Sequence, residues 1–168
     1  MIELKAQKLT PKAFAKYGEY VNLLDDESHA RNSVLTEGFF PDLSVLNFGI
    51  GTLPTISVCS NKKQDKMIVD FLEYHAYTCE GLVALDADVV IYVGVPGANH
   101  EMKVENCEAF IVPKGYFVKL EPYIIHGPQF PVDADSAHVI CMLPQRTFHN
   151  DVVKIIVTDE QKKGIIVL

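Results

Sequence analysis

The sequence predicts a mainly β protein whose short strands form a closed barrel or a sandwich, preceded by a short N-terminal helix. From residue 43 onward, short segments rich in β-branched and aromatic residues alternate with Gly, Pro, Asn and Asp, which is the pattern of strands joined by turns. The second half shows no helical periodicity. The 168 residues contain no linker and no internal repeat, so we expect one domain over 1–168, with a helix and irregular arm at 1–42 and a barrel at 43–168.

The N-terminal helix is predicted from residues that favour helix ends. Thr10 can cap the first turn, Pro11 suits the first helical position, and Gly18 is placed to end the helix. The chain from 19 to 42 is polar and lacks periodicity, so we expect it to be irregular.

The strands are predicted from their composition and from the turn residues that bound them. The candidate segments are Ser44–Phe48, Thr55–Cys59, Met67–Tyr77, Gly81–Leu85, Val89–Val95, Glu108–Val112, Tyr116–Leu120, Ala137–Leu143 and Val152–Val157. The apolar tail Gly164–Leu168 is expected to add a strand, either to the barrel of the same chain or to a partner chain.

The bulk composition excludes two classes of partner. The net charge of −7, with no basic run, argues against nucleic-acid binding. No apolar run approaches the roughly 20 residues that cross a bilayer, and the N-terminus lacks a signal-peptide core. The 4 cysteines are widely spaced, which favours reduced thiols and a cytoplasmic location.

Four residues form a candidate metal site. On a strand, Glu73 and His75 share a face because side chains two apart point the same way. Glu80 follows a tight bend and can turn back toward that pair, and His126 is available from a distant segment. Imidazole and carboxylate ligands together suit Mn, Fe, Zn, Co or Ni, and the sequence does not choose among these divalent ions.

An alternative for the same residues is purely structural: the two glutamates lie on a solvated sheet face, and His75 is a hydrogen-bonded core residue. Burying two carboxylates without a cation is costly, which favours the metal site. Around it, Tyr77 is expected on the face of Glu73, and Phe71 is expected to supply an apolar wall for a small-molecule substrate.

The order of these features resembles the cupin superfamily. Its first motif, H-x-H followed by E, is similar to Glu73-x-His75-x-x-x-x-Glu80, and its second, P-x-G followed by H, is similar to Pro113-x-Gly115 and His126. The resemblance implies a jelly-roll-like β-barrel that holds a metal ion. Small cupins often pair through edge strands, which implies a homodimer.

Within the cupins, the chain resembles the ureidoglycolate lyase family. The family's opening segment is similar to Leu9–Gly18, and its later motifs are similar to 73–85, 113–115 and 123–126. Departures from the family pattern are Tyr74 for an arginine, Glu80 for a glutamine and Ile125 for a tryptophan. Lys119 is a candidate to bind a substrate carboxylate in place of the arginine.

The resemblance implies a lyase that splits ureidoglycolate into glyoxylate and urea. In that reaction Glu73 is the candidate base for the hydroxyl proton, and Tyr123 is the candidate acid for the departing nitrogen. Two other functions fit the same residues: a metal-dependent cupin isomerase or epimerase of a small sugar or hydroxy acid, and a non-enzymatic cupin that binds a small ligand.

Overall fold

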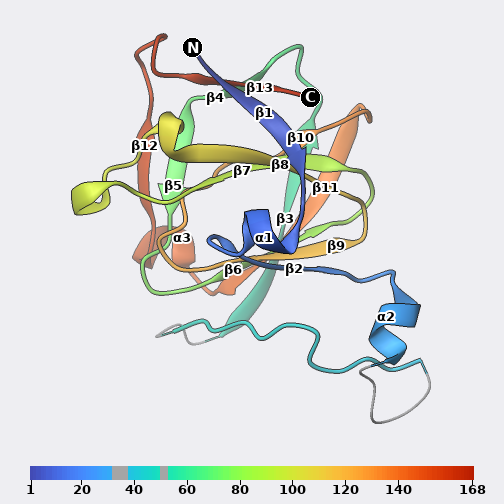
Figure 1. The fold of residues 1–168 in the computed structure, drawn as a ribbon. Helices are drawn as coiled ribbons and strands as arrows, with labels where there is room; N and C mark the ends of the chain where they lie inside the picture. The colour runs from blue at the N-terminus through green and yellow to red at the C-terminus, as the bar shows by residue number, and fades with distance from the viewer. Residues whose placement is uncertain (32–37, 50–52) are drawn as a thin grey trace.

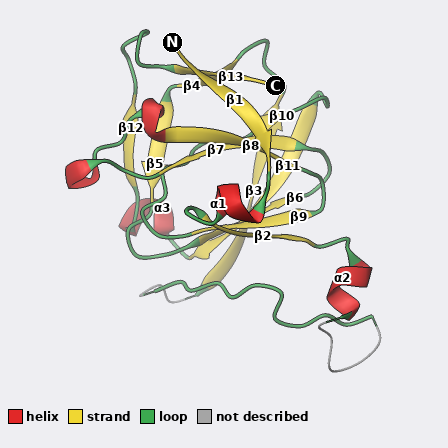
Figure 2. Ribbon diagram, in the orientation of Figure 1, coloured by secondary structure: helices red, strands yellow, loops and turns green. Residues whose placement is uncertain are grey.

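A computed structural model describes residues 1–31, 38–49 and 53–168 of the chain. The described part is mainly β, as predicted, and its few helices are short and lie outside the sheets (Figure 2). In chain order the elements are β1 (Ile2–Lys8), α1 (Pro11–Phe14), β2 (Gly18–Asn22), α2 (Asp26–Ala30), β3 (Pro54–Lys62), β4 (Met67–Val69), β5 (Phe71–Tyr74), β6 (Glu80–Ala84), β7 (Val89–Gly94), η1 (Ala98–His100), η2 (Val104–Asn106), β8 (Cys107–Val112), β9 (Tyr116–Leu120), β10 (Phe130–Pro131), β11 (Ser136–Pro144), α3 (Thr147–Asn150), β12 (Val153–Ile156) and β13 (Gly164–Val167).

Among the described residues the strands form two main sheets and a short strand pair (Figure 1). One sheet has the order β10-β7-β8-β1-β13-β4, the second has the order β2-β9-β6-β11-β3, and β12 pairs with β5. Two isolated bridges pair Glu73 of β5 with His126, and Gly94 of β7 with Ile125. The adjacent residues 125 and 126 thus connect β5 to the end of β7, which nearly closes the first sheet into a barrel.

The core is divided between the two faces of β7, which is buried at every position. Val89, Ile91 and Val93 pack with Leu82 and other residues of the second sheet. On the opposite face, the side chains of Val90 and Tyr92 pack with Leu72, Ile125 and Ile166 inside the barrel. Because β7 is buried on both faces, apolar and polar residues do not alternate along it, and its sequence is continuously apolar.

The N-terminal helix forms as predicted at its start and differs at its end. The Thr10 hydroxyl accepts a hydrogen bond from the Ala13 N–H at 3.2 Å, and Pro11 opens the helix. Gly18 does not end the helix but begins β2. A Cβ at Gly18 would lie 1.9 Å from the carbonyl oxygen of Lys119, so glycine is needed for β2 to approach β9.

Several predicted boundaries were wrong. The 19–42 stretch, expected to be irregular, contains β2 and α2, and its part 32–37 lies outside the described residues. The 44–48 segment is not a strand; its Leu46 side chain instead covers β6 near Gly81. The predicted strand 67–77 is broken at Asp70, whose carbonyl accepts a hydrogen bond from Val157.

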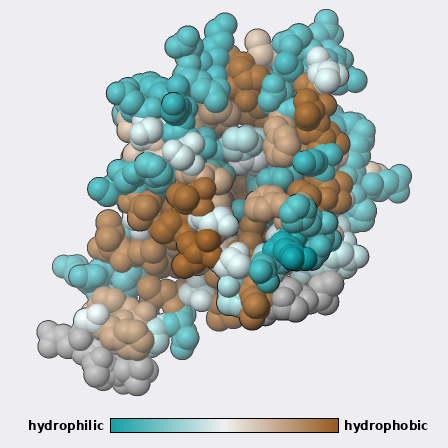
Figure 3. All heavy atoms as spheres, turned by 180° about the vertical axis from the view of Figure 1, so that it is seen from behind, coloured by the Kyte–Doolittle hydropathy of each residue, from teal (hydrophilic) through white to brown (hydrophobic). Residues whose placement is uncertain are grey.

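The apolar tail forms a strand of the same chain. β13 runs parallel to β1 and antiparallel to β4. Both edges of β13 are therefore paired within the chain, and this strand is not free to pair with a second copy. Apolar side chains do gather on the face seen in Figure 3, and Ile56 and Val58 of the edge strand β3 are exposed.

The described part of the chain has no helix with the length and apolar character of a membrane span. Its cysteines, Cys59, Cys79, Cys107 and Cys141, are all free thiols, as their spacing predicted.

Candidate metal centre

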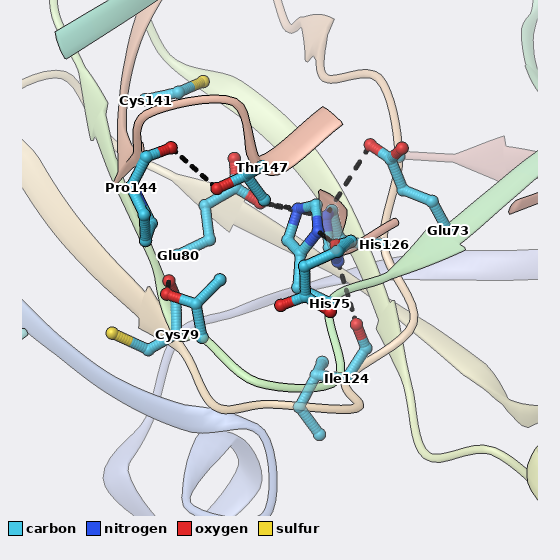
Figure 4. A network of polar contacts seen from close by, with 12 residues as sticks. Glu73, His75, Cys79, Glu80, Ile124, His126, Cys141, Pro144 and Thr147 are labelled. Atoms are coloured by element: carbon cyan, nitrogen blue, oxygen red, sulfur yellow. Dashed lines mark hydrogen bonds and ion pairs between the residues drawn. The ribbon is translucent and has the colours of Figure 1, made fainter. Parts of the chain in front are cut away.

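Three chain segments bring His75, Glu80 and His126 together. β5 ends at Tyr74, so His75 opens the bend that follows it, and Glu80 is the first residue of β6. His126 is held beside β5 by two backbone hydrogen bonds with Glu73, of 2.9 and 2.8 Å. Figure 4 shows the two rings and the Glu80 carboxylate turned toward one another.

Close backbone approach fixes the position of His126. A Cβ on the next residue, Gly127, would lie 1.8 Å from the hydroxyl oxygen of Tyr92. That hydroxyl donates a 2.5 Å hydrogen bond to the carbonyl of Phe71. Glycine at 127 therefore lets the His126 segment pass between β7 and β5.

The three side chains form a compact, buried group. One ligand atom from each lies within 4.8 Å of the others. His126 Nε2 lies 2.9 Å from Glu80 Oε2, and His75 Nε2 lies 3.7 Å from the same oxygen. The exposed fractions of His75, Glu80 and His126 are 2%, 5% and 6%. Such burial makes an uncompensated carboxylate unfavourable.

The unpaired atoms of the group are those that a metal ion needs. Among the described residues, the buried side-chain atoms without a hydrogen bond are His75 Nε2, Glu80 Oε2 and His126 Nε2. Both Nδ1 atoms are engaged, since His75 Nδ1 donates to the Asp151 carbonyl at 2.6 Å and His126 Nδ1 to the Ile124 carbonyl at 2.8 Å. With Nδ1 protonated, each neutral imidazole presents its Nε2 lone pair to the centre of the group. Two imidazoles and one carboxylate fit a divalent transition metal.

In the absence of a metal ion, a proton on His126 balances the negative charge of Glu80. Burial lowers the pKa of His126, but the charge and close contact of Glu80, the charge of Glu73 and the hydrogen bond to Ile124 together outweigh burial and raise that pKa to about 9. Burial alone raises the pKa of Glu80, but the charge of His126 and the close contacts of the carboxylate with both histidines lower it to about 2. The metal-free protein at neutral pH therefore holds an imidazolium beside a carboxylate.

Metal binding is expected to displace that proton. Because His126 must be neutral to coordinate, loading at pH 7.5 releases about one proton per metal ion, and the apparent affinity rises about tenfold per pH unit up to about pH 9. Titration of a divalent metal into weakly buffered protein with a pH indicator measures the release. No proton release, together with a pH-independent affinity between pH 7 and 9, would contradict this assignment.

Glu73 lies at the edge of the group rather than within it. Its Oε1 is 3.7 Å from His126 Nε2, and its side chain is 14% exposed, against 7% for that of Glu80. Burial raises the pKa of Glu73; the charges of His126 and His75 partly offset that effect, and the smaller contributions of Glu80, which raises the pKa, and Lys154, which lowers it, follow. A carboxylate with a raised pKa beside a metal group is suited to accept a proton.

Asp151 supports the site and was not found by sequence reasoning. Its carboxylate accepts hydrogen bonds from the N–H groups of Ala76 and Tyr77, at 2.8 and 2.9 Å, and its carbonyl accepts from His75. It thus fixes both the bend and the ring that the bend presents. An isolated aspartate 76 residues away from His75 carries no sequence signal for this role.

An Asp151→Ala variant keeps the carbonyl that accepts from His75 but loses the carboxylate that holds the bend, so it is expected to bind metal about 10- to 100-fold more weakly, as is usual when a supporting contact of a metal ligand is lost. Competition with a chromophoric chelator measures the affinity. Asp86→Ala is the matched control, because the Asp86 carboxylate likewise makes two hydrogen bonds, both with the half-buried His138 and neither with a member of the group. Equal affinities for wild type and Asp151→Ala would show that the bend holds His75 unaided.

The structure does not bring Lys119 to the group. Its alternate neighbours on β9, Val118 and Leu120, face the core, and Leu120 is the register partner of Glu80. Lys119 therefore points from the opposite face, where its Nζ pairs with Glu19 at 2.9 Å and Glu121 at 3.1 Å.

Tyr77 and Tyr123 also lie apart from the group. Tyr77 follows the end of β5 and is exposed, so the strand parity that placed it beside Glu73 does not apply. Tyr123 has a φ of +67° and its ring lies 4.8 Å from that of His100 and 5.4 Å from that of Tyr74. Since Tyr74 faces the barrel core, Tyr123 packs on the side of β5 away from Glu73.

Phe71 is the one predicted wall residue on the face of Glu73. The two are alternate residues of β5, and the residue between them, Leu72, is fully buried in the barrel core. The side chain of Phe71 therefore points to the same side as Glu73.

Comparison with known proteins identifies one family. The family model described as "Ureidoglycolate lyase" matches residues 1–162. No curated protein matches the chain.

Similar solved structures are distant. They include RmlC from Streptococcus suis in complex with dTDP-D-xylose (11% identity, TM-score 0.36, 55% of this chain and 44% of that one). Fe(II)-HppE with the alternative substrate (S)-1-HPP shows 14% identity, a TM-score of 0.40, and coverage of 67% and 60%. A dTDP-4-dehydrorhamnose 3,5-epimerase from Elizabethkingia anophelis NUHP1 shows 11% identity, a TM-score of 0.36, and coverage of 68% and 55%. The chain thus spans between 44% and 60% of the length of these proteins.

Proposed function

Because this chain belongs to the ureidoglycolate lyase family, we propose that it is a metal-dependent C–N lyase that splits ureidoglycolate, or a closely related ureido hydroxy acid, into glyoxylate and urea. The observation that carries the proposal is the buried group of His75, Glu80 and His126 with its three unpaired ligand atoms. A barrel that only binds a small organic ligand has no need of three buried ligand atoms that converge on one point.

The group fits a divalent metal ion held by the two Nε2 atoms and by Glu80. When bound, such an ion would supply a Lewis acid that makes the hydroxyl of a hydroxy acid substrate more acidic. The donor set is compatible with Mn, Fe, Zn, Co or Ni.

Glu73 supports the proton transfer that the reaction needs. Cleavage of the C–N bond requires a base to take the hydroxyl proton as the carbonyl of glyoxylate forms. The Glu73 carboxylate lies beside His126 at the edge of the group and is more exposed than Glu80. We assign it as that base, which then passes the proton to the departing nitrogen to complete urea, and we assign Phe71 on the same face as an apolar contact for the substrate.

Two further properties belong to the proposal. The free thiols of Cys79, Cys107 and the other cysteines support a reducing compartment, the cytoplasm. A homodimer is also proposed, through a surface other than the tail, and the exposed apolar residues of β3 support it.

The proposal is tested by following glyoxylate release from ureidoglycolate, with protein loaded separately with each of the five metals and with chelator-treated protein as the control. Glyoxylate and urea in equal amounts, formed only with metal present, are expected. If metal-loaded protein releases no glyoxylate from ureidoglycolate or its close analogues, the lyase assignment is wrong.

A further inference from the structure

Lys154 lies directly opposite Glu73 on the neighbouring strand. β12 pairs antiparallel with β5, in the register Lys154 with Glu73 and Ile156 with Phe71. Side chains directly opposite each other in an antiparallel pair lie on one face of the sheet, with Cβ atoms about 5 Å apart. Lys154 is therefore on the same face as the proposed base.

That face is the one turned toward the metal group. The other face of β5 carries Leu72 and Tyr74 into the barrel core. Glu73 reaches toward His126 from the opposite face, at 3.7 Å.

Lys154 is exposed and not committed to another carboxylate. Within the described residues, its Nζ is in none of the ion pairs of 4.0 Å or less, in contrast to Lys119, which has two such pairs, and Lys163, which pairs with Asp70 and Glu160. A lysine on a flexible stem can place its charge on a ligand that arrives at this face. A bound anion would give this cation the partner that it lacks.

We propose that Lys154 binds the carboxylate of the substrate and sets the preference of the site for small α-hydroxy carboxylates over their neutral analogues. The inference rests on the proposed function and adds its anion-binding residue. Lys154 takes the role that the sequence suggested for Lys119. The Lys119 side chain lies on the opposite face of its sheet and is paired with Glu19 and Glu121.

The test measures binding of two probes, glycolate and its neutral isostere glycolamide, to cobalt-loaded protein by calorimetry and by the visible spectrum of the ion. The variants are Lys154→Met and Lys154→Arg. Lys8→Met is the matched control, because Lys8 is also an exposed strand lysine, located on β1. Cobalt content is measured for every sample, so that loss of metal is separated from loss of the anion site.

Lys154→Met is expected to bind glycolate about 10- to 100-fold more weakly, the effect of losing a hydrogen bond to a charged group, with glycolamide binding and cobalt content unchanged. Lys154→Arg and Lys8→Met retain glycolate binding. Equal glycolate affinity in wild type and Lys154→Met would overturn the inference about Lys154. It would not bear on whether the wild type has lyase activity. Absence of glycolate binding to the wild type overturns the inference, and absence of glyoxylate release separately overturns the proposed function.

Discussion

A Glu80→Gln variant is expected to lose both metal and activity. Glu80 is the anionic member of the buried group, and its Oε2 is within reach of both histidine Nε2 atoms. Glutamine has nearly the same volume but no charge, so the fold is kept while the site loses the ligand that attracts the cation. We expect metal content to fall from near one per chain to below about a tenth, and glyoxylate release to fall at least about 100-fold.

Elemental mass spectrometry of protein purified without chelator measures the metal content, and circular dichroism checks the fold. Glu121→Gln is the matched control, because Glu121 is an exposed carboxylate paired with Lys119 away from the group. Full metal occupancy in Glu80→Gln would mean that Glu80 is not a ligand.

Glu73→Gln is expected to separate catalysis from metal binding. The amide cannot accept the hydroxyl proton, and loss of a general base typically costs about 100- to 10,000-fold in rate. Because Glu73 stands outside the compact group of three, metal content and KM are expected to stay near those of the wild type, while kcat falls.

The pH profile provides a second readout for Glu73. Burial raises the pKa of Glu73, and deprotonation of this base should give an acid limb along which the wild-type rate rises with pH. The acid limb should be absent in Glu73→Gln. Loss of bound metal in this variant would instead identify Glu73 as a fourth ligand, and unchanged kcat would exclude it as the base.

The barrel was predictable because most of its strands carry local signals. β9 was located at its true ends, and β7 and β11 to within one residue, from β-branched runs bounded by turn residues. β1 was not predicted, although Ile2, Leu4 and Ala6 alternate with polar residues in the pattern of a strand. The two-residue β10 is too short to show any pattern.

The residue types predicted three members of the candidate metal group, His75, Glu80 and His126, while the reasoning from strand parity was only partly right. His75 does not lie on a strand beside Glu73, because β5 ends at Tyr74. A bend capped by Asp151 turns it toward Glu80 instead. Contacts between segments this far apart depend on the folded backbone, which composition and spacing do not reveal.

The roles of the two lysines depended on the same long-range information. Lys119 matched the expected chemistry, but the register of β9 turns it away from Glu80. Lys154 was not singled out, because its value comes from lying opposite Glu73 across a strand pair. Sequence reasoning thus proposed the candidate ligands and a lysine for the substrate carboxylate, whereas the position of Lys154 opposite Glu73 became visible only in the folded structure.

The most direct test of this account is a crystal structure of metal-supplemented protein, with anomalous diffraction collected at the absorption edge of the metal. The account predicts one anomalous peak about 2.0–2.3 Å from His75 Nε2, His126 Nε2 and a Glu80 carboxylate oxygen. It would be contradicted by crystals in which saturating metal gives no peak there and Glu80 remains paired directly with His126.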